Sequence, residues 1–241
     1  VANPFSLIVY LPNEFIFSIR NYSNDTIKFY KLNNFAYVFN SYCNTPKDLF
    51  ISGGQGGTKD FWKINNIKTN IEKLKDMPYE KEKHSMIYIP KKYIYFIGGN
   101  SKQTFYYDEF EDSFNNWSYL NNEINSPALA LIDNTYIYSF GTQNNQYASD
   151  FIERTNLREK PKWDILRIKI NNPPFNMKNF GVALSDDKKV YFLGGREEKG
   201  HKLFSFDIGK NEITKCRQEN FSIIGYDKSF YNLNDYNSAF I

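Results

Sequence analysis

Short apolar runs, each followed directly by small residues, recur along the chain at a nearly constant interval. In three places the run ends in a glycine pair, at Gly53-Gly54, Gly98-Gly99 and Gly194-Gly195, and a degenerate copy ends at Gly141-Thr142. Successive copies lie about 45 residues apart, with a longer interval before the last. The runs are rich in β-branched and aromatic residues, which favour strands. The pattern of apolar positions therefore predicts a repeated β unit.

Each unit contains the same order of expected strands. Before the glycines, an apolar strand and a polar turn precede a second apolar strand, as in residues 85–97, and residues 6–19 follow the same order. After the glycines, an aromatic strand and a polar turn lead to a fourth strand, as at 104–107 and 117–120. No segment shows convincing helical periodicity. Four short strands in about 45 residues are typical of a propeller blade, so an all-β fold is predicted.

The number of second strands gives the expected number of blades. These strands begin at Phe15, Leu49, Tyr93, Tyr136, Val190 and Ser229. About six four-stranded blades are therefore expected, in a single domain over residues 1–241 with the clearest blades between 35 and 216. Only one strand fits between Phe29 and Gly53, where two are expected, and the unit after Ser229 runs out early. The terminal blades are thus predicted to be degenerate or incomplete.

Glycines and aromatic residues have expected roles in this scaffold. The second strand ends in a crowded region near the ring axis, and glycine permits the positive φ and the close approach that an immediate turn requires. Rings on the outer strands, as in Phe61-Trp62 and Tyr106-Tyr107, are expected to fill the wedge between adjacent blades, with their polar ends on backbone groups. These residues are predicted to build the scaffold, and the glycine pairs to mark where loops emerge.

The order of these elements resembles the kelch repeat, in which an apolar run, a glycine pair, an aromatic outer strand and a tryptophan follow one another. The cleanest copy runs from Tyr95 to Gly99 and continues with Tyr107 and Trp117. The units of Gly53 and Gly194 keep the glycines without the tryptophan, whereas Trp163 follows the imperfect Gly141-Thr142. In the first unit Arg20-Asn21 stands where glycines are expected. The resemblance implies a kelch-type β-propeller; another propeller class with the same strand pattern is the open alternative.

The same resemblance implies a protein-interaction module or scaffold subunit that works without a cofactor. Kelch domains serve as substrate-recruiting arms of ubiquitin ligases and as cytoskeletal binders. A protein or peptide partner, such as a component of a ubiquitin ligase or of the cytoskeleton, is therefore expected. The alternative is a kelch propeller that binds or isomerises a sugar or another small ligand, for which Arg196, Glu198 and His201 form the candidate set.

In a propeller, the loops after the glycine pairs gather on one face. The partner-binding face is predicted to include Arg20, Tyr22, Gln55, Lys59, Ser101, Lys102, Asn144, Arg196, Glu198 and His201. Its lysines and arginines would make the face mildly basic and suited to an acidic or polar segment. For each of these residues, an ordinary solvated turn is the competing interpretation.

Catalytic and metal sites are disfavoured by the residues present. His84, His201, Cys43 and Cys216 show no metal-ligand spacing, and the chain has no Gly-x-Ser-x-Gly element. No catalytic residue, metal or cofactor is therefore expected, and the protein is not expected to be an enzyme.

Three polar segments have simpler interpretations. The glycine-rich residues 53–59 resemble a phosphate-binding loop, but Thr58 precedes Lys59 and a strand is expected next, whereas a P-loop opens a helix. Residues 108–112 carry four carboxylates and are predicted to form a solvated turn between the third and fourth strands. Residues 79–84, which include His84, alternate in charge and are predicted to form a soluble, charged connection between blades.

Composition narrows the classes of partner and environment. The chain has 30 basic and 27 acidic residues and a formal charge of +3, which is too balanced for a nucleic-acid-binding surface. No apolar run of 18 residues occurs, so a transmembrane helix is not expected, and the first residues show no signal-peptide pattern. With only two cysteines, a reduced intracellular environment is favoured, and a cytoplasmic location is predicted.

Overall fold

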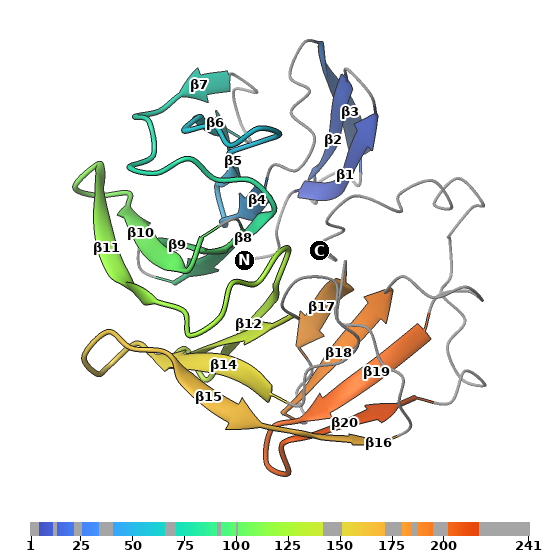
Figure 1. Cartoon of the computed structure of the whole chain (residues 1–241). Helices are drawn as coiled ribbons and strands as arrows, with labels where there is room; N and C mark the ends of the chain where they lie inside the picture. The colour runs from blue at the N-terminus through green and yellow to red at the C-terminus, as the bar shows by residue number, and fades with distance from the viewer. Residues whose placement is uncertain are drawn as a thin grey trace.

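The computed structural model describes residues 5–11, 14–21, 26–33, 41–65, 71–90, 93–99, 101–141, 151–171, 180–184, 188–194 and 202–216, and all structural statements concern these residues. Within them the chain forms strands β1 to β20 and no helix. The strands build five separate sheets, which follow the order of the sequence (Figure 1). The prediction of an all-β protein is therefore confirmed for the described part of the chain.

The first sheet contains β1 (Phe5–Leu11), β2 (Glu14–Asn21) and β3 (Thr26–Asn33). The second contains β4 (Ser41–Asn44), β5 (Asp48–Ser52), β6 (Phe61–Asn65) and β7 (Ile71–Lys73). The third contains β8 (His84–Ile89), β9 (Tyr93–Gly98), β10 (Gln103–Asp108) and β11 (Ser113–Tyr119). In the second and third sheets each strand pairs antiparallel with the next one in sequence, as the pattern of apolar runs predicts.

The fourth sheet contains β12 (Ala128–Ile132), β13 (Tyr136–Phe140), β14 (Phe151–Asn156) and β15 (Asp164–Arg167), again antiparallel and in sequence order. The fifth contains β17 (Phe180–Leu184), β18 (Lys189–Gly194), β19 (Lys202–Asp207) and β20 (Glu212–Lys215), with β16 (Lys169–Asn171) along its outer edge. The four-stranded unit thus recurs in the second, third and fourth sheets and forms the antiparallel part of the fifth.

Strand β16 was not predicted. It has only three residues, which is too short for an alternating pattern to show, and it exists because Ile170 comes to lie beside Ile213 of β20. The two strands run parallel, and the backbone N–H of Lys169 donates to the carbonyl of Asn211 over 2.8 Å. The segment that leaves the fourth sheet therefore covers the outer edge of the fifth, where unpaired backbone groups would otherwise face solvent.

The ends of the chain agree with the sequence as far as they are described. Among the residues described between Phe29 and Gly53, β4 is the one strand that lies between β3 and β5, and it opens the second sheet. The first sheet consequently has three described strands instead of four. The expected sixth unit at Ser229 lies outside the described residues, as does the last part of the expected domain.

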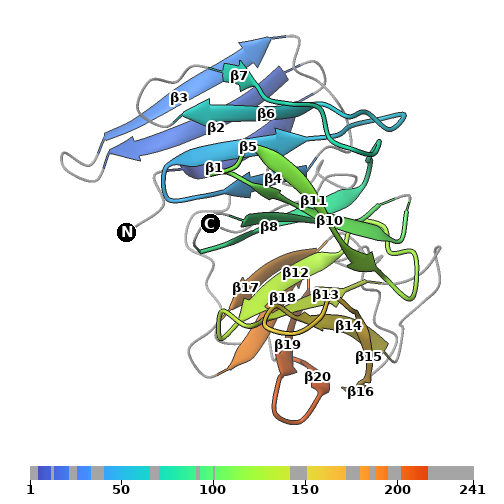
Figure 2. The ribbon, with the colours of Figure 1, turned by 90° about the vertical axis from the view of Figure 1, so that its left-hand side faces the viewer.

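The five sheets lie one after another around a common centre (Figure 1), and the view from the side shows them side by side as successive layers (Figure 2). The first strands of neighbouring sheets contact each other near this centre: β4 contacts β8, β8 contacts β12, and β12 contacts β17. From the second sheet to the fifth, each sheet therefore contacts the next through the strand that opens it, and the later strands extend outward.

The hydrophobic core is divided among the spaces between successive sheets. One cluster, with Phe50, Phe61 and Phe96, joins the second and third sheets. A second, with Tyr95 and Ile137, joins the third and fourth. A third cluster, with side chains such as Phe140, Phe192 and Phe206, joins the fourth and fifth. Because the second to fifth sheets bury side chains against their neighbours, these sheets must assemble together.

Gly98 illustrates why glycines end the second strands. Its φ is +76°, and a Cβ there would lie 2.5 Å from the carbonyl oxygen of Ile124. The next residue, Gly99, donates its N–H to the same carbonyl over 2.8 Å. The predicted positive φ and close approach are both confirmed, and the crowding comes from the connection to the next sheet, which crosses over the glycines.

The tryptophans of the third and fourth sheets fill the wedge between these sheets, as the sequence predicts. Trp117 belongs to β11 and donates its indole N–H to the hydroxyl of Thr155 in β14 over 3.1 Å. Trp163 precedes β15 and donates to the hydroxyl of Thr104 in β10 over 3.2 Å. The indoles thus bond across the wedge in both directions, and their partners are threonine side chains, whereas backbone groups were expected.

Candidate functional site

The structure describes the side chains of four residues of the predicted partner-binding face. Gln55 and Lys59 are exposed in the loop between β5 and β6, while Ser101 is half-buried and Lys102 exposed in the loop between β9 and β10. Arg20 lies inside β2, where its backbone pairs with Ile27, and so belongs to a strand. The predicted site residues Tyr22, Asn144, Arg196, Glu198 and His201 lie outside the described residues.

The glycine-rich segment after β5 is a tight loop followed by a strand. The N–H of Gly57 donates to the carbonyl of Gly54 over 3.0 Å, and the N–H of Gly53 donates to the carbonyl of Asp60 over 2.9 Å. Strand β6 begins at Phe61, directly after this loop. A P-loop would open a helix here, so the interpretation of this segment as a turn is confirmed.

Two connections between sheets lie against the loops of the predicted face. Residues 74–83 lead from the second sheet to the third, and residues 120–127 lead from the third to the fourth. Lys81 of the first connection forms two backbone bonds with the β5–β6 loop. Its carbonyl accepts from the N–H of Gly54 over 3.1 Å, and its N–H donates to the carbonyl of Thr58 over 3.1 Å. The first connection is thereby held on the β5–β6 loop of the sheet that it leaves.

The side chain of Lys81 attaches this connection to the next sheet as well. Its ammonium group donates to the carbonyl of Gly98 over 2.9 Å and to the carbonyl of Gln103 over 2.8 Å, at the two ends of the β9–β10 loop. The residue is 0% exposed, and the Nζ atom lies 5.8 Å from the centre of the Phe105 ring. Lys81 thus links the β5–β6 loop to the β9–β10 loop. We call this arrangement the Lys81 joint.

Burial lowers the pKa of Lys81 to about 8, because the charged form loses its hydration. The two carbonyl oxygens replace part of that hydration, and a face of an aromatic ring adds a weak attraction for a cation. A lysine held in this way by neutral groups fixes the position of the first connection against the β9–β10 loop, although burying its charge is unfavourable.

The second connection is held by a buried carboxylate. Glu153 of β14 is 0% exposed and accepts hydrogen bonds from the backbone N–H of Asn121 over 2.8 Å and from that of Asn122 over 2.9 Å. The side-chain amides of both asparagines donate to the same carboxylate, each over 3.1 Å. We call this arrangement the Glu153 joint. It fixes the connection from the third sheet onto the fourth.

His84 does not lie in a charged turn, and that prediction is wrong. It is the first residue of β8, it is 0% exposed, and its Nε2 lies 2.7 Å from the hydroxyl oxygen of Ser52. Burial lowers the pKa of His84 to about 3, and the nearby charge of Lys81 contributes. The burial of Lys81 contradicts the same prediction, because this part of the connection is not exposed to solvent. The connection folds back over the glycines of the second sheet, and sequence alone does not show that contact.

The Ser52–His84 pair has the spacing of a nucleophile and its base, but its surroundings do not suit catalysis. Ser52 is 0% exposed, and its hydroxyl also lies 3.1 Å from the sulfur of Met86. A substrate needs access to the nucleophile, and neither partner of this pair is open to solvent. The pair therefore belongs to the packing between the second and third sheets.

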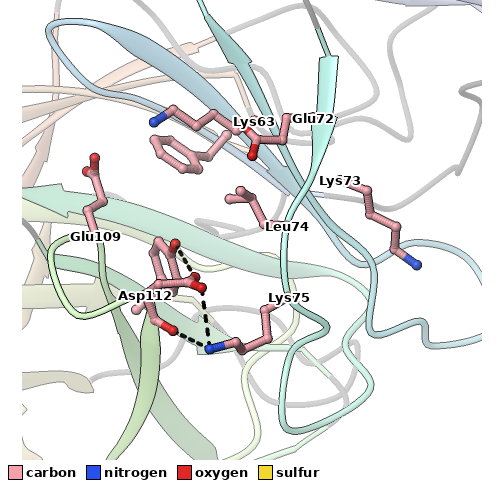
Figure 3. Close-up of a pocket in the computed structure, with 9 residues that line it drawn as sticks. Lys63, Glu72, Lys73, Leu74, Lys75, Glu109 and Asp112 are labelled. Carbon is pink, nitrogen blue, oxygen red and sulfur yellow. Dashed lines mark hydrogen bonds and ion pairs between the residues drawn. The ribbon is translucent and has the colours of Figure 1, made fainter.

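A cavity of about 310 Å³ opens between the second and third sheets, away from the predicted face (Figure 3). We call it the lateral cavity. Its lining residues are Phe50, Lys63, Glu72, Lys73, Leu74, Lys75, Tyr107, Glu109 and Asp112. They come from β5, β6, β7, the connection that follows β7, β10 and the turn between β10 and β11. The cavity combines two aromatic rings and one leucine with charged groups of both signs.

The turn of residues 108–112 connects the third and fourth strands of its sheet, as predicted. Its carboxylates are not all solvated, however. Glu109 is half-buried at the lateral cavity, and burial raises the pKa of its carboxyl group. Asp112 accepts a hydrogen bond from the Tyr107 hydroxyl over 2.9 Å. Phe110, at the tip of the turn, is 72% exposed. The prediction of a plain solvated loop is therefore incomplete.

Within the described residues, no group of three or more His, Cys, Asp and Glu side chains is arranged to hold a metal ion. The two cysteines are present as free thiols, and burial raises the pKa of Cys43 to about 12. The search for a helix long and apolar enough to cross a membrane finds none in the part of the chain that the structure describes.

Comparisons with known proteins assign no family to this geometry. No protein-family model matches the sequence, and no curated protein is significantly similar to it. The kelch resemblance and the functions that follow from it are therefore proposals. The small-ligand alternative stays a prediction too, because Arg196, Glu198 and His201 lie outside the described residues.

Proposed function

We propose that the chain is a kelch-type β-propeller that serves as a protein-interaction module without a cofactor. The four-stranded units, their arrangement around a common centre and the contacts between their first strands support this fold. The glycine pairs at the ends of β5 and β9, where the kelch repeat has them, support the family. A partner from a ubiquitin ligase or the cytoskeleton is what this family favours.

The observation that carries the proposed function is the Lys81 joint. Lys81 holds the β5–β6 loop, the first connection and the β9–β10 loop together through backbone and side-chain bonds. The N–H of Gly56 also donates to the carboxylate of Glu82 over 3.0 Å. Loops fixed before binding lose little conformational freedom when a partner docks, so more of the contact energy appears as affinity. A braced surface of several loops is therefore suited to binding a protein.

The chemistry of this face fits an acidic or polar segment. Lys59 and Lys102 bring positive charge, and Gln55 brings an amide that donates and accepts. The ammonium group of Lys102 also donates to the carbonyl of Asn121 over 2.7 Å, so that this side chain is partly fixed. Charges at the rim of an interface mainly affect selectivity and association rate. We therefore assign them the choice of partner.

The test compares the purified wild-type protein, a face variant and a control variant. Each is used in quantitative affinity capture from the source cell and is then titrated with the captured partner. The face variant combines Gln55→Ala with Lys59→Glu, because both side chains are exposed. The control is Lys47→Glu, which makes the same charge change in the exposed turn between β4 and β5, at the opposite end of β5. We expect the face variant to lose about tenfold in affinity, which equals ~1.4 kcal/mol, and the control to lose almost none.

A partner that binds all three proteins equally would contradict the proposed face. Loss of binding by Lys47→Glu with retention by the face variant would place the interface at the other end of the strands. Thermal unfolding of each variant checks that the fold is preserved, since exposed substitutions usually change stability by less than ~0.5 kcal/mol.

A further inference from the structure

We infer that the lateral cavity binds a lysine or arginine side chain of a polypeptide partner. The cavity lies near the β10–β11 turn, whereas the loop face proposed above lies at the other end of β10. The inference therefore concerns a second site, and it does not depend on the loop face.

The lining of the cavity is mostly polar and includes three apolar side chains, which the methylene stem of a basic side chain could contact. Phe50 and Tyr107 contribute rings that are almost completely buried, and the ammonium group of Lys63 lies 5.6 Å from the centre of the Phe50 ring. Leu74 is half-buried. The volume of about 310 Å³ lies at the lower end of the range for ligand pockets. Lysine and arginine bury their methylene stems on apolar surface and keep their charge near the solvent. One such side chain is of the right size and character.

The lysines that line the cavity are already paired with carboxylates. Lys63 lies 3.1 Å from Asp48, whose side chain is only 6% exposed, and Lys75 lies 3.4 Å from Asp112. The ammonium group of Lys73 points away from Glu72, Glu109 and Asp112 in Figure 3. These pairs leave little positive charge for a ligand to meet.

Lys73 is engaged outside the cavity, where it forms ion pairs with Asp60 over 2.9 Å and with Asp76 over 3.2 Å. These two carboxylates, through their side-chain bonds, raise the pKa of Lys73. An anionic ligand in the cavity would have to compete with aspartates for every one of the three lysines.

Two carboxylates are left without such partners. The side-chain carboxylates of Glu72 and Glu109 form no hydrogen bond or salt bridge with the residues that the structure describes, and Lys63 and Lys47 act on Glu109 only at longer range. A cationic side chain could pair with either group without breaking any of these interactions. Because burial already disfavours the charge of Glu109, a cation that restores a counter-charge is favoured there.

The wall that carries Glu109 is fixed before any ligand arrives. The carboxylate of Asp108 accepts from the N–H of Phe110 over 2.9 Å and from the N–H of Glu111 over 3.2 Å. Lys75 donates to the carbonyl of Asp112 over 2.5 Å and so ties the turn to the segment after β7.

The test uses three short capped peptides as probes, Ac-Ala-Arg-Ala-NH₂, its citrulline counterpart and its glutamate counterpart, titrated into the protein and followed by NMR. Citrulline keeps the shape of arginine and removes the charge. We expect the arginine peptide to bind saturably in the millimolar range, the citrulline peptide to bind at least fivefold more weakly, and the glutamate peptide not to bind.

Variants then locate the site. Glu72→Gln and Glu109→Gln should each weaken binding of the arginine peptide about two- to fivefold, and the double variant about tenfold. The matched control is Glu111→Gln, an exposed carboxylate of the same turn that does not line the cavity, and it should leave binding unchanged. The loop-face variant with Gln55→Ala and Lys59→Glu should also bind the peptide normally, which separates failure of this site from failure of the proposed function.

The inference would be overturned by absence of saturable binding of the arginine peptide to the wild-type protein, by equal affinity for the citrulline peptide, or by preferential binding of the glutamate peptide. Equal affinity of the wild-type protein and the double variant for the arginine peptide would also contradict the inference. If the double variant does not fold, the comparison of arginine with citrulline on the wild-type protein still decides the question.

Discussion

The Lys81 joint and the Glu153 joint hold two successive connections between sheets, and they do so with opposite charges. At the first, a completely buried ammonium group donates to the carbonyls of Gly98 and Gln103. At the second, a completely buried carboxylate accepts four hydrogen bonds from Asn121 and Asn122. Neither charge is paired with an opposite charge in these bonds. Each buried charge instead suits the backbone groups at its junction. The ammonium group of Lys81 lies at carbonyl oxygens, and the carboxylate of Glu153 lies at N–H groups.

The two joints should differ in strength for the same reason. A carbonyl oxygen has two lone pairs and tolerates the loss of one partner, whereas a buried N–H without an acceptor is rare and costly. Glu153 serves the backbone N–H groups of both Asn121 and Asn122, while Lys81 adds bonds to carbonyls. We therefore expect the Glu153 joint to contribute more to stability than the Lys81 joint.

The largest effect is expected for Glu153→Ala. It removes the carboxylate that accepts these bonds and leaves backbone N–H groups of Asn121 and Asn122 without their acceptor. The free energy of unfolding, measured in urea, should fall by ~3–5 kcal/mol. Glu123→Ala in the same connection is the control and should change it by less than ~0.5 kcal/mol, because Glu123 is exposed. A loss below ~1 kcal/mol for Glu153→Ala would remove the distinction between the joints.

The next effect is expected at Gly98, which takes part in both regions. Its carbonyl accepts from Lys81, and a Cβ on it would lie 2.5 Å from the carbonyl oxygen of Ile124 in the second connection. Gly98→Ala should lower the free energy of unfolding by ~3 kcal/mol.

Gly56 provides a matched comparison for this glycine. Its φ is +84°, and a Cβ there would meet no atom within 4 Å. Gly56→Ala should therefore cost only the backbone strain, ~1 kcal/mol. Equal losses for Gly56→Ala and Gly98→Ala, measured by the same urea unfolding, would mean that the crowding by the connection is unimportant.

The smallest effect is expected for Lys81→Met at neutral pH. Methionine keeps an unbranched side chain beside Phe105, removes a costly buried charge and gives up two bonds to carbonyls, so the net loss should be ~1 kcal/mol. A loss larger than that of Glu153→Ala would reverse the proposed order of the joints.

The pH dependence of the free energy of unfolding, compared between the wild-type protein and Lys81→Met, tests the buried charge directly. The pKa of Lys81 is about 8 in the folded protein and 10.5 when unperturbed, so between these values the unfolded chain binds a proton that the folded chain has lost. Stability therefore rises with pH in this window. From pH ~7.5 to ~9.5 the wild-type protein should gain ~2 kcal/mol relative to Lys81→Met. Parallel pH profiles of the two proteins would contradict a buried, charged Lys81 at neutral pH.

The strands of the second, third and fourth sheets could be predicted because their signals are local. The run before Gly98-Gly99 has its apolar residues, its turn and its glycines within one short segment. Strand β16 could not be predicted, since it depends on Ile170 lying beside Ile213. Asn144 and Arg196 lie outside the described residues, so their predicted roles stay predictions.

The polar residues show the limit most clearly. Residues 79–84 alternate in charge, and such a segment is usually solvated, but Lys81 and His84 are buried because the connection folds over the glycine loop of its own sheet. Glu109 follows a turn pattern, but its place in the lateral cavity depends on how the third sheet packs against the second. In each case the sequence indicates the local element and gives no sign of its partner.

The sequence by itself determined the repeated four-stranded unit, the positions of its turns and the positions where loops leave the second strands. These features depend on alternation, β-branched and aromatic residues and glycine, whose effects act within a few residues. Only the tertiary structure decided which charges are buried, which loops are joined and where a cavity opens. Those properties arise from contacts between sheets that are distant in sequence, such as the bonds from Lys81 to Gly98 and from Asn121 to Glu153.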